Sequence, residues 1–184
     1  MKKLLYKWSI EDWHELVASG VLDDKKVELL QGDIVTMSPE GLLHSYTQQS
    51  TSDYLTDLLR GKAHIRDAHP ITLDDSEPEP DLAIVRLPKE VYLQHHPYAE
   101  DIYFIVEIAN RSLAKDLGEK AGIYARNKIA EYWVIDLQHK ELIVHRNPEG
   151  NNYSQIVRYQ TGTVSPLAFP DLKLKLDVLL VSSA

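Results

Sequence analysis

From residue 102 the chain reads Ile102-Tyr103-Phe104-Ile105-Val106-Glu107-Ile108, and from residue 131 it reads Glu131-Tyr132-Trp133-Val134-Ile135-Asp136. Both runs are short and largely apolar, which is typical of buried strands. The residues between them, at about 117–127, have the pattern of a helix, so this part of the chain reads as strand–helix–strand. Helices and strands also intermix elsewhere. These features predict an α/β fold with a mixed central β-sheet flanked by α-helices.

Two helices are expected before this unit. The first begins at the N-cap Ser9, has Asp12 in the place of the Glu of a capping box, and ends at Gly20. Its inward side chains are expected to be Trp13, Leu16 and Val17. The second spans about 41–60 and ends at Gly61, with an apolar face formed by Leu43, Tyr46, Tyr54, Leu55, Leu58 and Leu59.

Further strands are expected on both sides of the strand–helix–strand unit. They are 27–37 (as strand, turn and strand), 64–73, 81–86, and a hairpin formed by 142–145 and 153–157 around the turn 147–152. The alternating leucines after Gly162 read as an edge strand or a short helix.

Composition limits the class of protein. The 184 residues predict one domain, 1–184, with a sizeable core. A hydrophobic content of 43% and a charged content of 26% are typical of soluble globular proteins. The chain has no cysteine, which excludes disulfides, thiolate zinc sites and cysteine nucleophiles. Neither a signal peptide nor an apolar run of roughly 18–20 residues is apparent, so we expect a cytoplasmic protein with no membrane partner.

The charge balance counts against nucleic-acid binding. The net charge is −8, whereas most nucleic-acid binders have a basic surface. A nuclease would need a local basic face or contacts to phosphate through a metal. Such a face could come from Arg111, Lys115, Arg126 and Lys128, which could equally be an ordinary solvated helix surface. The acidic stretch 74–80 reads as a solvated loop stiffened by proline.

Two acidic side chains stand at the ends of apolar runs. Asp81 opens the run 82–85, and Glu107 lies near the end of the run that begins at residue 102. Carboxylates in such positions are costly to bury unless a positive charge joins them. If the two strands are neighbours, about 4.8 Å apart, Asp81 and Glu107 can share one Mg²⁺, with the main-chain carbonyl of Ile108 as a further ligand. The alternative is that both acids simply reach the surface at strand ends.

Three other polar residues have open assignments. Lys120 could pair only with Asp116, four residues earlier on the same helix face, or it could orient an attacking water or stabilise charge on a phosphate. Glu28 could be a third carboxylate of the site or an exposed strand residue. A lone histidine such as His44 is more often a solvated or capping residue than a catalyst.

At these residues the chain resembles the PD-(D/E)XK, restriction-endonuclease-like superfamily, and more closely its Uma-type family, over roughly residues 8 to 145. The classical lysine position, two residues after the Glu, holds Ala109 here, and the Uma-type pattern moves the lysine to the next helix, at Lys120. A second departure is 109–112, where the family more often shows a Ser-Pro-Ser turn. The resemblance is carried by 27–35, Met37-Ser38-Pro39 with His44, Pro80-Asp81-Leu82-Ala83, Val106-Glu107-Ile108, 116–120 with Tyr124-Ala125, and 131–136.

The resemblance implies a four- to five-stranded mixed sheet and a nuclease site. It implies that Asp81 and Glu107 bind the metal, that Glu28 is an accessory acid, and that Lys120 assists catalysis. The leading hypothesis is a Mg²⁺-dependent endonuclease that hydrolyses phosphodiester bonds in DNA, with Mn²⁺ as a substitute. Cleavage of both DNA strands needs two active sites, so we expect a homodimer.

Two other hypotheses belong to different classes. The acidic composition and the absent classical lysine favour a catalytically inactive interaction or nucleic-acid-binding module that retains the nuclease fold. A carboxylate-pair hydrolase such as a glycosidase is the weakest hypothesis, because nothing in the aromatic content points to a sugar cleft.

Overall fold

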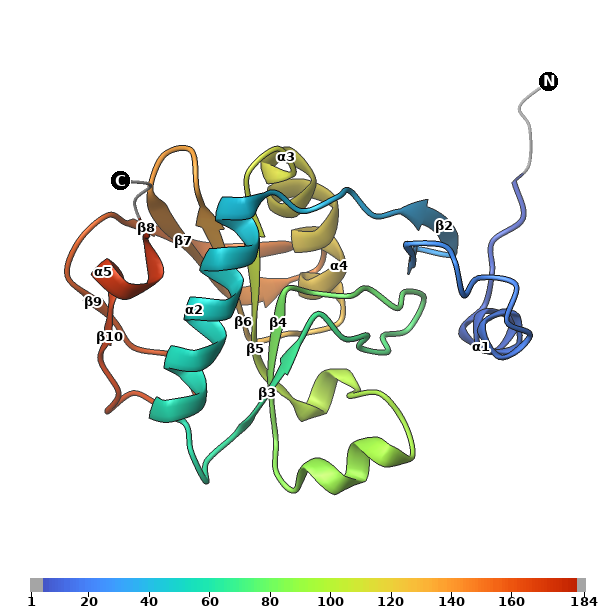
Figure 1. The fold of residues 1–184 in the computed structure, drawn as a ribbon, viewed down its shortest axis with the longest axis horizontal. Coiled ribbons are helices and arrows are strands. Elements are labelled where there is room, and N and C mark those ends of the chain that lie inside the picture. Colours follow the sequence, from blue (N-terminus) through green and yellow to red (C-terminus); the bar gives the residue numbers. More distant parts are fainter. Residues whose placement is uncertain (1–4, 182–184) are drawn as a thin grey trace.

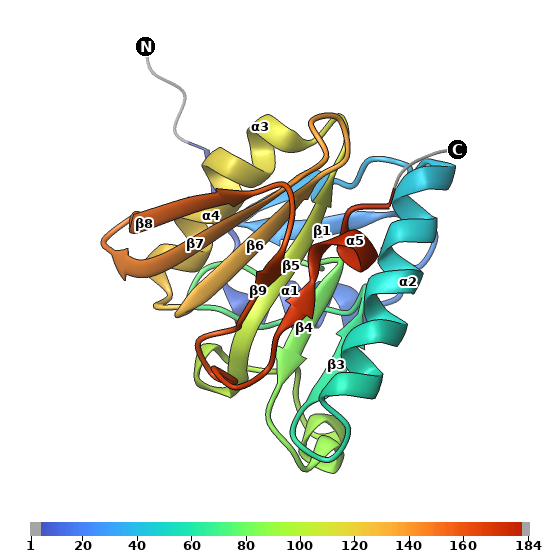
Figure 2. The same cartoon turned by 90° about the vertical axis from the view of Figure 1, so that its left-hand side faces the viewer.

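The computed structural model describes residues 5–181, and its central feature is a six-stranded sheet (Figures 1 and 2). Strands β5 and β6 pair in parallel, and the other neighbouring strands of this sheet pair antiparallel. The order across the sheet is β3 (His64–Asp67), β4 (Leu82–Val85), β5 (Ile102–Ala109), β6 (Glu131–Asp136), β7 (Glu141–Glu149) and β8 (Asn152–Tyr159). The mixed α/β sheet is confirmed, with one strand more than the resemblance implies.

The parallel pair needs a connection that crosses one face of the sheet. This connection is helical throughout and consists of α3 (Leu113–Lys115), the π-helical turn η3 (Asp116–Lys120) and α4 (Ala121–Arg126). The helix α2 (Leu42–Leu58) lies on the opposite face, as Figure 2 shows. Each face of the sheet therefore has its own apolar core, one beneath α4 and one beneath α2.

The alternation of side chains along β4 and β5 puts both predicted acids on the same face. Ala83 and Ile105 belong to the core beneath α4, whereas Leu82 and Val106 belong to the core beneath α2. Side chains two residues apart in a strand point to the same face. Glu107 therefore points to the α4 side, and the odd-numbered Asp81, just before β4, is in phase with it.

A smaller unit at the N-terminus packs beside the sheet. It contains α1 (Ile10–Ala18) and the antiparallel pair β1 (Val27–Leu30) and β2 (Asp33–Thr36), to the right in Figure 1. The expected N-cap is confirmed: Ser9 and Asp12 form a capping box. The remaining elements are η1 (Lys89–Leu93), η2 (Ala99–Asp101), β9 (Thr163–Val164), β10 (Leu174–Lys175) and α5 (Leu176–Leu179).

The acidic stretch 74–80 is not the solvated loop that the sequence predicts. Ser76 and Glu77 are buried, and the main chain of Glu77 pairs with Leu29 of β1. The Glu77 carboxylate accepts hydrogen bonds from Trp13 Nε1 and Thr72 Oγ1, at 3.0 and 2.7 Å. Because these donors satisfy the carboxylate, the segment can be buried and can join the N-terminal unit to the sheet.

Other differences are local. The strand expected over 64–73 ends at Asp67, and the hairpin strands extend through most of the expected turn, which closes at Gly150-Asn151. Val17 and Tyr46, expected in the core, are 47% and 62% exposed. The buried face of α2 is largely polar instead and consists of Thr47, Gln48, Thr51, Ser52 and Leu55.

Over residues 5–181, no helix combines the length and apolar character that crossing a membrane requires.

The packing of the core beneath α2 can be tested at Leu82. The Leu82 side chain is fully buried, so Leu82→Ala should lower the free energy of unfolding by about 2–5 kcal/mol. Leu93→Ala is the matched control, because Leu93 is 81% exposed and should change stability by less than about 0.5 kcal/mol. Urea unfolding measures both, and equal losses in the two variants would contradict the described packing.

Candidate active site

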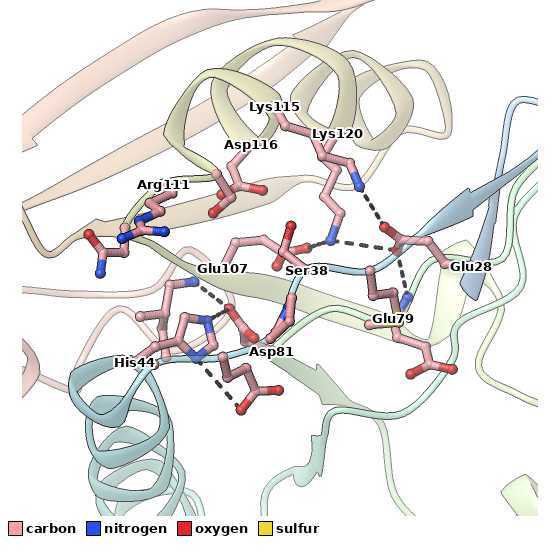
Figure 3. A pocket seen from close by; sticks show the side chains of 17 residues that line it. Glu28, Ser38, His44, Glu79, Asp81, Glu107, Arg111, Lys115, Asp116 and Lys120 are labelled. Atoms are coloured by element: carbon pink, nitrogen blue, oxygen red, sulfur yellow. Dashed lines mark hydrogen bonds and ion pairs between the residues drawn. The ribbon is translucent and has the colours of Figure 1, made fainter. Parts of the chain in front are cut away.

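A pocket of about 660 Å³ opens where β4 begins and β5 ends. It contains every residue that the sequence singles out for catalysis or metal binding: Glu28, Asp81, Glu107, Ile108 and Lys120. Figure 3 shows how side chains from β1, α2, β5 and the helical connection converge on it. Residues that are far apart in the sequence thus form one charged site.

Asp81 is fixed just before the start of β4 through both its main chain and its side chain. Asp81 Oδ2 accepts the Ile108 main-chain N–H at 2.6 Å, which confirms that the two strand ends are neighbours. The Asp81 carbonyl accepts hydrogen bonds from the Ala68 N–H at 3.0 Å and from Gln48 Nε2 at 3.3 Å. Because the N–H and C=O of one extended residue point to the same side of a strand, the Ile108 carbonyl also lies on the Asp81 side.

Glu107 is buried, with 4% of its surface exposed. Its Oε1 atom accepts hydrogen bonds from Lys120 Nζ and from the Tyr124 hydroxyl, each at 2.8 Å. Burial raises the pKa of Glu107 to about 8; the Lys120 ammonium opposes this rise, and the Asp81 carboxylate adds to it. A second positive charge near Glu107 would therefore favour its ionised form.

Lys120 is bound by two carboxylates and not by Asp116. Lys120 Nζ lies 2.8 Å from Glu107 Oε1 and 3.7 Å from Glu28 Oε2. Burial by itself lowers the pKa of Lys120, but the Glu107 and Glu28 carboxylates outweigh it and raise the pKa above its usual value. Lys120 therefore stays protonated, and an ammonium in this state can stabilise negative charge but cannot accept a proton.

Glu28 is buried and lines the pocket, so it is not an exposed strand residue. It is 2% exposed, and its Oε1 atom accepts a hydrogen bond from Lys115 Nζ at 2.8 Å. Its Oε2 atom accepts the Glu79 main-chain N–H at 3.3 Å. Glu28 thus holds together β1, the segment before β4, and the two lysines of the helical connection.

The expectation of a solvated or capping role for His44 is wrong. The His44 side chain is 13% exposed, and its Nε2 atom lies 3.2 Å from Asp81 Oδ2. Burial lowers the pKa of His44, but the hydrogen bond to Asp81 and the Asp81 charge outweigh it and raise the pKa. The polar face of α2 that begins near His44 was the signal for this position, because polar side chains on a buried helix face need partners.

Only two of the four residues of the predicted basic patch lie at the pocket. Arg111 and Lys115 line the pocket, whereas Arg126 and Lys128 do not. Arg126 instead lies near Asp75, with 3.6 Å between Arg126 Nη2 and Asp75 Oδ1. The sequence also gave no reason to place Glu40 and Glu79 at the pocket, which they line.

The donor set fits a hard divalent cation. The pocket is lined by six carboxylates, those of Glu28, Glu40, Glu79, Asp81, Glu107 and Asp116, against the cations of Arg111, Lys115 and Lys120. Within residues 5–181, Asp81 Oδ1 and Glu107 Oε2 accept no hydrogen bond. No group of three His, Asp or Glu side chains in this part of the chain is arranged to hold a metal ion as it stands. Metal binding therefore requires side-chain movements, above all of Glu107, whose Oε1 atom is bound to Lys120 and Tyr124.

The buried lysine can be tested by its effect on stability. Lys120→Met should lower the free energy of unfolding by about 3–5 kcal/mol, because Glu28 and Glu107 lose their shared cation. Adding Glu107→Gln should restore part of this loss. The loss should grow with pH above about 8, because Glu107 then ionises beside Lys120 in the folded wild type, whereas without this ammonium its pKa in the folded variant lies higher still.

Urea unfolding in EDTA, at several pH values, measures this cycle. Lys173→Met is the control, since Lys173 is exposed and should have little effect. Additive losses in the double variant would contradict the coupling between Lys120 and Glu107.

Comparison with known proteins identifies the fold and the family of this chain. A crystal structure described as a "putative nuclease belonging to DUF820", from Anabaena variabilis ATCC 29413, has a similar fold, with a TM-score of 0.68 and 16% sequence identity over 84% of this chain and 89% of that chain. No curated protein matches the chain. The model of the Uma2 family, described as "Putative restriction endonuclease", matches residues 10–178. With the match spanning almost the whole chain and the fold agreeing, the protein belongs to the Uma2 family of restriction-endonuclease-like proteins.

Proposed function

We propose that this protein is a Mg²⁺-dependent endonuclease that hydrolyses phosphodiester bonds in DNA, with Mn²⁺ able to replace Mg²⁺. The observation that carries the proposal is the placement of Asp81 and Glu107 on adjoining strand ends, in one pocket, with the protonated Lys120 bound to Glu107. The family description supports the reaction class at the level of a nuclease.

Electrostatics supports the need for a metal. Six carboxylates face three cationic side chains in the pocket, so an approaching phosphate is repelled unless cations enter as well. Asp81, Glu107 and the Ile108 carbonyl would hold the ion. When bound, Mg²⁺ polarises a phosphate oxygen and lowers the pKa of a water molecule.

The side chains of the pocket have separate tasks. Lys120 stabilises the negative charge that develops on the phosphate, since its ammonium is buried and stays protonated. Glu28 fixes Lys115 and Lys120 in place through its two oxygens. Arg111, exposed where the pocket opens, is suited to bind a phosphate of the DNA backbone.

One observation favours the alternative of an inactive module that retains the fold. The two lysines of the pocket are already paired with carboxylates, Lys115 with Glu28 and Lys120 with Glu107. Lysines paired in this way can stabilise the pocket without a metal. The two functions differ in whether Asp81 and Glu107 are needed for cleavage.

Plasmid cleavage distinguishes them. With Mg²⁺ or Mn²⁺, the wild type should convert covalently closed circular DNA to open or linear forms, and EDTA should stop the reaction. Asp81→Asn and Glu107→Gln keep the side-chain shapes but remove charge, and each should lower the rate by roughly 100-fold or more.

Glu119→Gln is the matched control, because Glu119 is exposed next to Lys120 and does not line the pocket. Cleavage that all three variants retain at the wild-type rate would refute the proposal. Absence of cleavage in the wild type, together with metal-independent DNA binding, would favour the inactive module.

We further propose that the active form is a homodimer, since cutting both strands of a duplex needs two pockets. Sedimentation of the protein should then give the mass of two chains, and a monomer at the concentrations that linearise plasmid would contradict it.

A further inference from the structure

His44 lies beside the carboxylate that is proposed to hold the metal. Its Nε2 atom is 3.2 Å from Asp81 Oδ2. The two side chains come from different elements, because His44 is in the first turn of α2 and Asp81 directly precedes β4. Figure 3 shows the imidazole directed at the Asp81 carboxylate within the pocket.

The separation of these two atoms fits a shared metal ion. Ligand atoms at adjacent corners of an octahedron lie about 3 Å apart when each metal bond is about 2.1 Å long. The Nε2 to Oδ2 distance of 3.2 Å is close to that separation. Binding of one ion by both side chains requires them to move, because Nε2 now faces Oδ2 and Oδ2 also accepts the Ile108 N–H.

The second ring nitrogen gives an independent indication. His44 Nδ1 is buried and has no hydrogen-bond partner among residues 5–181. Glu40 Oε2 lies 3.9 Å from Nδ1, on a side chain that is 43% exposed and has room to move closer. A histidine that binds a metal through Nε2 carries its proton on Nδ1 and usually donates it to a carboxylate or carbonyl. Glu40 is placed to accept that proton's hydrogen bond.

From this arrangement we propose that His44 is a further ligand of the metal at Asp81, and that Glu40 is a positioning residue that orients the imidazole. The inference rests on the proposed function, because it adds a ligand to the same metal site. A histidine ligand would also determine which metal ion the site prefers. Imidazole nitrogen is a common ligand of first-row transition metals, whereas Mg²⁺ takes oxygen ligands. The site should therefore prefer Mn²⁺ to Mg²⁺.

Titration calorimetry of the whole chain with Mn²⁺ and with Mg²⁺ measures this preference. His44→Ala should raise the Kd for Mn²⁺ by roughly tenfold or more, and should raise the Kd for Mg²⁺ by a smaller factor. Glu40→Gln should weaken Mn²⁺ binding less than His44→Ala does. Alanine is well tolerated in a helix, and the Tm of each variant checks that it is folded.

Spin-echo spectroscopy of bound Mn²⁺ gives a direct readout that does not depend on activity. The wild type should show a nitrogen coupling from a directly bound imidazole, and His44→Ala should lose it. His14→Ala is the matched control, because His14 is also a helix histidine beside a carboxylate, that of Glu77, but does not line the pocket. This variant should keep the coupling.

The possible results separate the two proposals. Mn²⁺ binding that Asp81→Asn abolishes, but that shows no nitrogen coupling, would overturn the role of His44 and leave the carboxylate metal site intact. An unchanged ratio of Mn²⁺ to Mg²⁺ affinity in His44→Ala would also overturn it. Failure of the wild type to bind either metal would contradict both the His44 proposal and the proposed function.

Discussion

The site depends on the burial of one ammonium between two carboxylates. Glu28 and Glu107 are 2% and 4% exposed, and unpaired charges in such positions would cost several kcal/mol each. Lys120 contacts both of them, which joins β1, β5 and the helical connection through a single side chain. The smaller N-terminal unit is therefore tied to the sheet by the same charges that form the pocket.

The topology of the sheet explains why a lysine on a helix reaches a strand glutamate 13 residues earlier. Because β5 and β6 are parallel, the connection between them must cross one face of the sheet, and this is the face toward which the Glu107 side chain points. Lys120 lies at the end of the π-helical turn in that crossing. The π-turn is a local departure from α-helical geometry of a kind often found at functional sites. Ala109, where the classical pattern places its lysine, belongs to the apolar core beneath α4.

Sequence patterns were sufficient for the parts of the fold that depend on local periodicity. The buried strands, the capping box at Ser9 and the acids at the ends of β4 and β5 follow from alternation and from helix-start signals. Val17 and Tyr46 were misplaced because apolar character alone does not say which helix face packs. The burial of Glu77 and the position of His44 depend on partners that are distant in sequence. The polar face of α2 indicates that partners exist for His44, but local sequence does not identify Asp81 as that partner.

The central claim is that Asp81 and Glu107 bind one divalent cation. It is tested most directly by the anomalous X-ray signal of Mn²⁺ in crystals grown with that ion. The account predicts a single strong peak in the pocket, within bonding distance of carboxylate oxygens from both Asp81 and Glu107. A pocket with no peak, in which Glu107 keeps its contact with Lys120 and Asp81 keeps its contact with Ile108, would contradict it.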